Sequence, residues 1–159
     1  MSNKHIPHFE ELAFLNPKLG LKILQDFTYR GPDLFDFSVK WDGAPSVFIG
    51  MDNGEFFVST KSIFNKTPKL YKSHKDIKNS NIPVELQNKL MNVFDSHRWS
   101  QPKTVMQGDY MGDQWSIKLE MINGKLMQTF QPNNIVYAVP LTTSSIMTDS
   151  ICGIVWHTA

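Results

Sequence analysis

A lysine and an aspartate, two residues apart, stand where a predicted strand ends. In DFSVKWDGAPSVFIG (residues 36–50), apolar and polar residues alternate up to Lys40, which predicts a half-buried strand with Lys40 on its polar face. Asp42-Gly43 follows as a turn signal. A lysine that attacks phosphorus must lose its proton, although its ordinary pKa is about 10.4. Desolvation in a cleft lowers that pKa, so a lysine at this strand end is a candidate nucleophile.

The segment Lys40-Trp41-Asp42-Gly43 resembles the K-x-D-G signature of the covalent nucleotidyltransferases, the superfamily of ATP-dependent DNA ligases, RNA ligases and mRNA capping enzymes. The resemblance implies that Lys40 accepts AMP or GMP from ATP or GTP and passes it to a nucleic-acid end. It also implies that Asp42 and Gly43 bind the nucleotide and that Mg²⁺ or Mn²⁺ assists.

Four later segments resemble the superfamily's further motifs in the same order: FVSTKS, VMQGDYMG, NIVYAVP and CGIVWHT. By this resemblance Lys61 contacts a phosphate or the sugar, and Asp109 binds the nucleotide and a metal ion where glutamate is commoner. Tyr137 is the candidate for stacking on a purine. Gly153 and Val155 belong to the fourth motif, which also contacts the nucleotide.

Two departures from the family pattern bear on catalysis. Cys152 stands where the fourth motif has glutamate, and a thiol is a poor ligand for magnesium, which prefers oxygen. The fifth motif, a later strand with lysines that contact the α-phosphate, has no counterpart before Ala159. The segments KWDGAPS and GIVWHT also resemble those of a phage-encoded ligase-like group whose members are usually longer. These observations predict a reduced or truncated domain.

The elements that must position these residues form an α+β pattern. An amphipathic helix is predicted over 17–27 and a more strongly periodic one after Pro83. Hairpins are predicted over 36–60 and around Asn123-Gly124, and residues 65–82 are expected to form an exposed, mobile excursion. We expect residues 36–60 and 103–156 to form one antiparallel sheet system, an ATP-grasp-like ligase adenylation domain by the resemblance. The four residues Lys40, Lys61, Asp109 and Tyr137 should then line one cleft.

Composition places the chain among ordinary globular proteins. Its 159 residues fit one domain, with an N-terminal helical segment (1–35) and a motif-bearing core (36–159). The formal net charge of +1 gives no overall basic field, so nucleic-acid contact would depend on a local patch. A single cysteine and the lack of a membrane-length apolar run predict a cytoplasmic protein, in a bacterial or phage-infected cell by the resemblance.

Several alternatives stay open at this point. Trp41 and Tyr137 also fit plain core packing, and the lysine-rich tract of residues 61–78 is either a solvated loop or a phosphate-binding surface. Three functions follow: an enzyme nucleotidylated on Lys40, a nucleotide- or nucleic-acid-binding protein without turnover, or a structural or host-interaction protein in which KWDG is only a turn.

Overall fold

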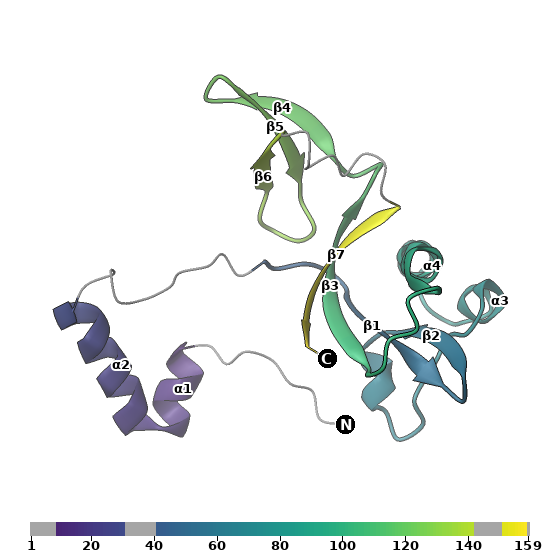
Figure 1. The fold of residues 1–159 in the computed structure, drawn as a ribbon, viewed down its shortest axis with the longest axis horizontal. Coiled ribbons are helices and arrows are strands. Elements are labelled where there is room, and N and C mark those ends of the chain that lie inside the picture. Colours follow the sequence, from purple (N-terminus) through teal and green to yellow (C-terminus); the bar gives the residue numbers. More distant parts are fainter. Residues whose placement is uncertain (1–8, 31–40, 142–150, 159) are drawn as a thin grey trace. The chain divides into compact units, whose positions relative to one another are not determined.

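The chain divides into two compact units, Met1–Lys40 and Trp41–Ala159. The computed structural model describes residues 9–30, 41–141 and 151–158 (Figure 1). The predicted strand end that carries Lys40 lies outside these described residues. The unit boundary follows Lys40, five residues later than the boundary predicted between the helical segment and the core.

The first unit holds two helices, α1 (Phe9–Leu15) and α2 (Pro17–Arg30). The helix predicted over 17–27 is confirmed, whereas α1 was not predicted. Pro17 occupies the first position of α2, where its missing N–H costs nothing, and the Asn16 side chain accepts a hydrogen bond from the Leu19 N–H at 3.2 Å. Gly20 allows the two helices to touch, because a Cβ there would lie 2.9 Å from the Ala13 Cα. Among the described residues no helix combines the length and apolar character needed to cross a bilayer.

In the second unit, four antiparallel strands form the larger sheet, in the order β2-β1-β3-β7 (Figure 1). These are β1 (Ser46–Asp52), β2 (Glu55–Ser59), β3 (Met106–Asp113) and β7 (Cys152–Thr158). The β1–β2 hairpin turns at Asn53-Gly54, with φ of 51° and 82°. Two consecutive positive φ angles match the twist of paired strands, which is why Asn-Gly predicts such turns.

Three further strands form a separate antiparallel sheet, β4 (Lys118–Ile122), β5 (Lys125–Phe130) and β6 (Tyr137–Pro140), in that order. The Asn123-Gly124 turn is confirmed, with φ of 50° and 74°. The prediction of one sheet system was wrong. The chain leaves β3 through a turn in which Asp113 accepts hydrogen bonds from the Trp115 and Ser116 N–H groups, at 3.1 and 3.0 Å. Within the described residues, the three strands that follow pair only with one another.

The main core lies between one face of the larger sheet and the helices α3 (His74–Lys78) and α4 (Val84–His97). Val47 and Ile49 of β1 and Val58 of β2 lie in this core, where they are fully or almost fully buried. Leu90 and Val93 of α4 are fully buried opposite them. The helix predicted after Pro83 is thereby confirmed.

The segment 65–82 differs from the predicted loose excursion. Tyr71 forms an isolated bridge with β2, exchanging two backbone hydrogen bonds of 2.9 Å with Val58. Ser73 caps α3 by accepting from the Asp76 N–H, and Ile77 is fully buried in the main core. Tyr71 and Ile77 stand isolated in a polar sequence, so no periodic pattern marked them as core residues.

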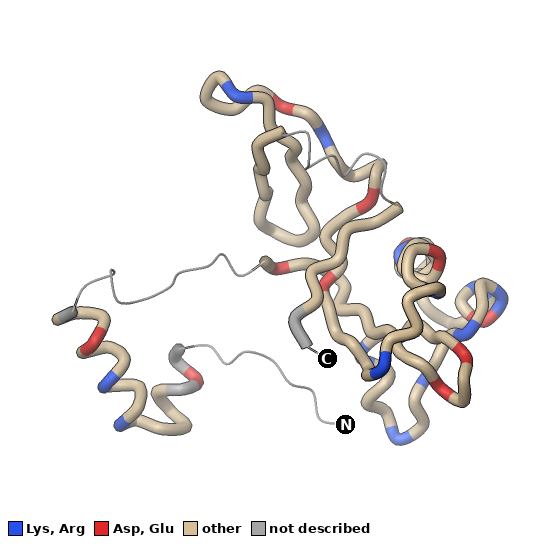
Figure 2. The backbone as a smooth tube through the Cα atoms, viewed as in Figure 1, with Lys and Arg blue, Asp and Glu red and all other residues tan. Residues whose placement is uncertain are grey.

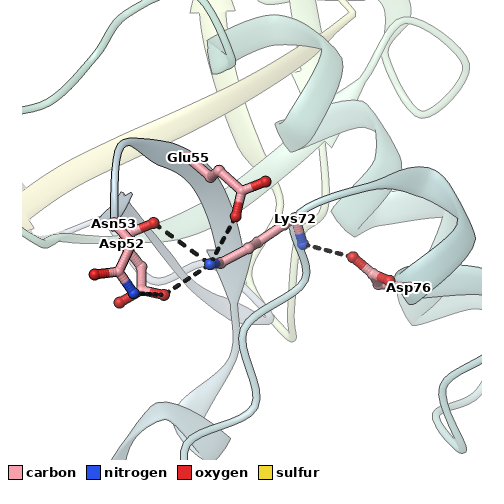
Figure 3. Close-up of polar contacts among 5 residues, drawn as sticks. All are labelled: Asp52, Asn53, Glu55, Lys72 and Asp76. Carbon is pink, nitrogen blue, oxygen red and sulfur yellow. Dashed lines mark hydrogen bonds and ion pairs between the residues drawn. The ribbon is translucent and has the colours of Figure 1, made fainter.

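Lys72 also ties this segment to the β1–β2 hairpin (Figure 3). Its Nζ lies 2.7 Å from Asp52 Oδ2 and 3.0 Å from Glu55 Oε2, while its backbone N–H donates to Asp76 Oδ2 at 3.0 Å. The hydrogen bonds that the Lys72 Nζ donates to Asp52 and then to Glu55 raise the pKa of Lys72 above its ordinary value. Exposed ion pairs of this kind contribute little to stability. The buried apolar residues of the segment therefore hold it more firmly than the lysine does.

Replacing Ile77 tests this packing. Ile77→Ala should lower the free energy of unfolding by about 2–5 kcal/mol, because it removes a fully buried side chain and leaves a cavity. Lys78→Ala, at the exposed neighbouring position, should change it by less than about 0.5 kcal/mol. Urea denaturation measures both. Equal, small effects of the two variants would show that the segment is not packed as described.

Candidate functional site

The segment from Trp41 to Pro45 lies against β3 in close contact. The Ala44 N–H donates to the Tyr110 carbonyl at 3.0 Å, and the Tyr110 N–H donates to the Pro45 carbonyl at 3.0 Å. A Cβ on Gly43 would lie 2.6 Å from the Tyr110 carbonyl oxygen and 2.8 Å from the Asp109 Cβ. Gly43 is not among the described glycines with positive φ, so its role is close approach and not the tight turn that Asp42-Gly43 predicted.

Asp42 and Trp41 connect this segment to the smaller sheet. The Asp42 N–H donates to Tyr137 Oη at 2.8 Å, and Asp42 Oδ2 accepts from Asn133 Nδ2 at 3.0 Å. The Trp41 ring stacks on Tyr137 and Phe130, with centroids 4.8 and 5.9 Å apart. Residues 41–43 thus bridge the two sheets.

Asp109 lies on the sheet face that Gly43 contacts. Ser46 Oγ donates to Asp109 Oδ1 at 2.8 Å, and Asp109 is the strand partner of Val155. Lys61 begins the short 3₁₀ helix η2 (Lys61–Phe64), directly after β2, and its side chain is exposed. Because β1 and β2 are antiparallel, the end of β2 lies beside the start of β1. Lys61 is therefore at the same end of the sheet as the Ser46–Asp109 pair.

A cavity of about 320 Å³ opens beside this segment, within the size range of small-ligand pockets. It is lined by residues of both sheets and by Trp41: Met111, Gln128, Phe130, Val139, Gly153, Ile154 and Val155. Its lining is apolar apart from Gln128, whose side chain is 1% exposed. Tyr137 is not part of the lining, because its ring lies against Trp41 and Phe130.

Cys152 directly precedes the cavity residue Gly153 in the sequence, but its side chain packs against the main core. Alternation along β7 puts Cys152 with Ile154 and Trp156 against the main core, while Val155 belongs to the cluster around Met111. The Cys152 Sγ is 3.4 Å from Ser96 Oγ on α4. Burial raises the pKa of the Cys152 thiol, so this cysteine stays protonated and is a poor metal ligand at neutral pH.

The carboxylates near the cavity do not form a metal cage. Across residues 9–30, 41–141 and 151–158, no three His, Cys, Asp or Glu side chains converge. Asp109 is engaged by Ser46, and Asp42 by Asn133. Mg²⁺ in nucleotide sites is commonly held by one or two carboxylates and the substrate phosphates. The described residues fit that arrangement better than an ion held by the protein alone.

Five of the predicted site residues thus lie in the segment from Trp41 to Pro45 or close to it: Asp42, Gly43, Asp109, Tyr137 and Val155. Gly153 lines the cavity, Lys61 lies at the same sheet end, and Lys40 is outside the described residues.

Five cavity residues were not predicted as site residues from the sequence: Met111, Gln128, Phe130, Val139 and Ile154. One signal was available for Gln128. It occupies an apolar position in the two-residue period of β5, between Leu126 and Phe130.

The lysines of residues 61–78 do not form one uniform surface. Lys72 is paired with two carboxylates, and acidic and basic positions are interspersed along α3 and α4 (Figure 2). Lys61, Lys66 and Lys69 are exposed on the segment after β2, and Lys75 and Lys78 are exposed on α3.

The sequence match to a family covers both units of the chain. Residues 3–159 match the family of unknown function DUF6267. The chain belongs to DUF6267. No curated protein and no solved structure matches it. The DUF6267 match includes the helical unit, the segment from Trp41 to Pro45 and every predicted motif from Lys40 to Val155.

The close contact at Gly43 gives a direct test. Gly43→Ala should lower the free energy of unfolding by about 1–3 kcal/mol, because the new methyl group meets backbone and buried side-chain atoms of β3 that cannot easily move. Ala138→Ser, at an exposed position of β6, is the control and should change stability little. Urea denaturation gives both values. A fully stable Gly43→Ala protein would show that residues 41–45 do not lie on β3.

Proposed function

We propose that this protein is a nucleotidyltransferase in which Lys40 accepts a nucleoside monophosphate from a nucleoside triphosphate. The observation that carries the proposal is the bridging segment: Trp41, Asp42 and Gly43, directly after Lys40, are fixed between β3 and the smaller sheet. A segment used only as a surface turn would need no such contacts with two sheets. Asp109 on β3 and the apolar cavity lie beside the same segment.

The cavity is suited to a nucleobase. Its aromatic rings, Trp41 and Phe130, offer faces for stacking, and the aliphatic side chain of Val155 contributes from the larger sheet. Tyr137 has a different role in this proposal: its hydroxyl accepts from the Asp42 N–H and its ring supports Trp41. The base would enter the cavity while the phosphates extend toward Asp109.

The reaction is a phosphoryl substitution. The neutral amine of Lys40 attacks the α-phosphorus, an N–P bond forms, and the bond to the pyrophosphate oxygen breaks with its electron pair. The amine proton passes to solvent. A divalent ion bound to the phosphates supplies charge neutralisation, and Asp109 is the residue that would help to hold it. Lys61 would add positive charge at the same sheet end.

The acceptor in this proposal is a nucleic-acid end, which would meet the protein in the cytoplasm of a bacterial or phage-infected cell. The exposed lysines after β2, Lys61, Lys66 and Lys69, are suited to phosphate contacts. Because Lys72 is already paired with Asp52 and Glu55, it contributes less. Affinity for nucleic acid should then fall as salt increases, with a slope set by a small number of phosphate contacts.

A second function, nucleotide binding without turnover, is favoured by the position of Cys152. The fourth motif of the resembling family has a glutamate there, whereas this thiol is half-buried and lies 3.4 Å from Ser96 Oγ of α4. A protein that lost this carboxylate but kept the cavity and the bridging segment would still bind a nucleotide.

Covalent labelling distinguishes these functions. Incubation with α-labelled ATP or GTP and Mg²⁺ or Mn²⁺ should leave label on the protein, as a phosphoramidate that is stable to base and lost in acid. Pyrophosphate should reverse it. Lys40→Arg should abolish labelling, because arginine keeps its charge but does not deprotonate in proteins. Asp42→Asn should weaken labelling less, since its backbone N–H still bonds to Tyr137.

Lys125→Arg is the matched control, because it makes the same substitution at an exposed lysine beside the Asn123-Gly124 turn, and its labelling should equal that of the parent. Nucleotide binding without label, measured by calorimetry and weakened by Lys40→Ala, would establish the second function in place of the first. Neither label nor binding at millimolar nucleotide would contradict both.

A further inference from the structure

The smaller sheet has an open edge at β4. Within residues 9–30, 41–141 and 151–158, β4 pairs with β5 on one side and with no strand on the other (Figure 1). Such an edge presents backbone N–H and C=O groups that can pair with another chain. The edge at β2 is bridged by Tyr71, whereas β6 ends in Pro140, which has no N–H to donate, and β7 pairs irregularly with β3. Among the described strands, β4 is therefore the edge most open to a partner.

The turn after β4 determines which of its backbone groups face outward. Ile122 and Lys125 flank the two-residue Asn123-Gly124 turn, so they form a hydrogen-bonded pair of the ladder. Hydrogen-bonded and non-hydrogen-bonded pairs alternate along antiparallel strands. Leu119 and Met121 are therefore the residues of β4 whose N–H and C=O groups point away from β5.

The two faces of β4 differ in character, and both are exposed. Leu119 and Met121 are 54% and 66% exposed, on the same face as Leu126 of β5, which is 42% exposed. Lys118 and Glu120 occupy the alternate positions and are exposed on the opposite face. Exposed apolar side chains that gather on one face are typical of an interaction surface.

We propose that β4 pairs with β4 of a second copy of this chain, antiparallel, about a twofold axis through Leu119. The two Leu119 residues then face each other and exchange N–H···O=C hydrogen bonds, because their backbone groups already point outward. On the same face, Met121 of each copy lies opposite Ile117 of the other. On the opposite face, Lys118 of each copy lies opposite Glu120 of the other.

Charge identifies the partner as a second copy, because the strand is complementary to itself. Antiparallel pairing inverts the order Lys118-Leu119-Glu120, so each lysine meets a glutamate twice over, as a twofold interface requires. These are non-hydrogen-bonded pairs, in which opposite side chains lie closest. An axis through Glu120 would instead oppose two carboxylates, so the charges also select the register. Lysines alone, a common protection of edge strands, would repel the copy.

The pairing would join β4–β6 of both copies into one continuous sheet. Leu119 is the strand partner of Gln128, which is in turn the partner of Val139, so all three lie on one face. Gln128 and Val139 line the cavity. The apolar face of the joined sheet would therefore run from the cavity of one copy to that of the other. This inference does not depend on what the cavity binds.

Charge reversal and sedimentation equilibrium test this dimer. The parent should dimerise with a dissociation constant in the micromolar range, as expected of a small interface. In Lys118→Glu and in Glu120→Lys both attractive pairs become repulsive, so each variant alone should dimerise at least about tenfold more weakly. Lys78→Glu, which changes the net charge as Lys118→Glu does at an exposed position of α3, should dimerise as the parent does.

Mixing the two charge-reversed variants tests the register. Lys118→Glu and Glu120→Lys in equal amounts should form a heterodimer, because every pair across the axis is then of opposite charge. The double variant Lys118→Glu/Glu120→Lys should regain the homodimer, which shows that the single variants lose charge pairing and not their fold.

Three results would overturn the inference. A parent that remains monomeric at high micromolar concentration would exclude the dimer. A dimer that both charge reversals leave intact would show that the copies meet through another surface. Variants that do not associate on mixing would contradict the pairing of Lys118 with Glu120.

Discussion

The close approach of Gly43 to β3 is the contact on which the candidate site depends. A side chain there would overlap the Tyr110 carbonyl and the Asp109 side chain, so only glycine allows the Ala44 and Tyr110 N–H groups to complete their hydrogen bonds. Once this backbone contact is made, the adjacent residues have little freedom. Asp42 reaches Tyr137, and Trp41 lies on the aromatic rings of the smaller sheet.

The segment from Trp41 to Gly43 also connects the two sheets of the second unit. Strands β4–β6 share no strand pairing with the larger sheet in the part of the chain that the structure describes. Their connection includes the cluster of Met111, Phe130 and Tyr137 with Trp41 and Val155, and the cavity lies in the same region. A ligand in the cavity would contact both sheets and would add to the contacts that already join them. Binding should therefore stabilise the folded protein by mass action.

The sequence predicted local features better than their assembly. Both Asn-Gly hairpins and the helix after Pro83 follow from short-range rules of turn geometry and periodicity. The division into two sheets was not predictable, because alternation identifies a strand but not its partner. Ile77 was missed because a single apolar residue in a lysine-rich tract carries no periodic signal.

The candidate site shows the same limit. The K-x-D-G signature located the bridging segment, but the physical reason for Gly43 is contact with β3 and not the turn that Asp-Gly suggested. Tyr137 was expected to offer its ring, and its hydroxyl instead accepts from Asp42 while Trp41 covers the ring. In the sequence Gln128 was marked only by its apolar position in the period of β5, and the structure adds that its Nε2 is buried without a partner.

The central claim is that a nucleobase occupies the cavity between the sheets. Nuclear Overhauser effects between the base protons of bound AMP and ¹³C-labelled methionine methyl groups test it most directly, because Met111 lines the cavity whereas Met106 of the same strand packs against the main core. We expect contacts from the adenine protons to the Met111 methyl group and none to Met106. Saturating AMP that gives no contact with Met111 would contradict it.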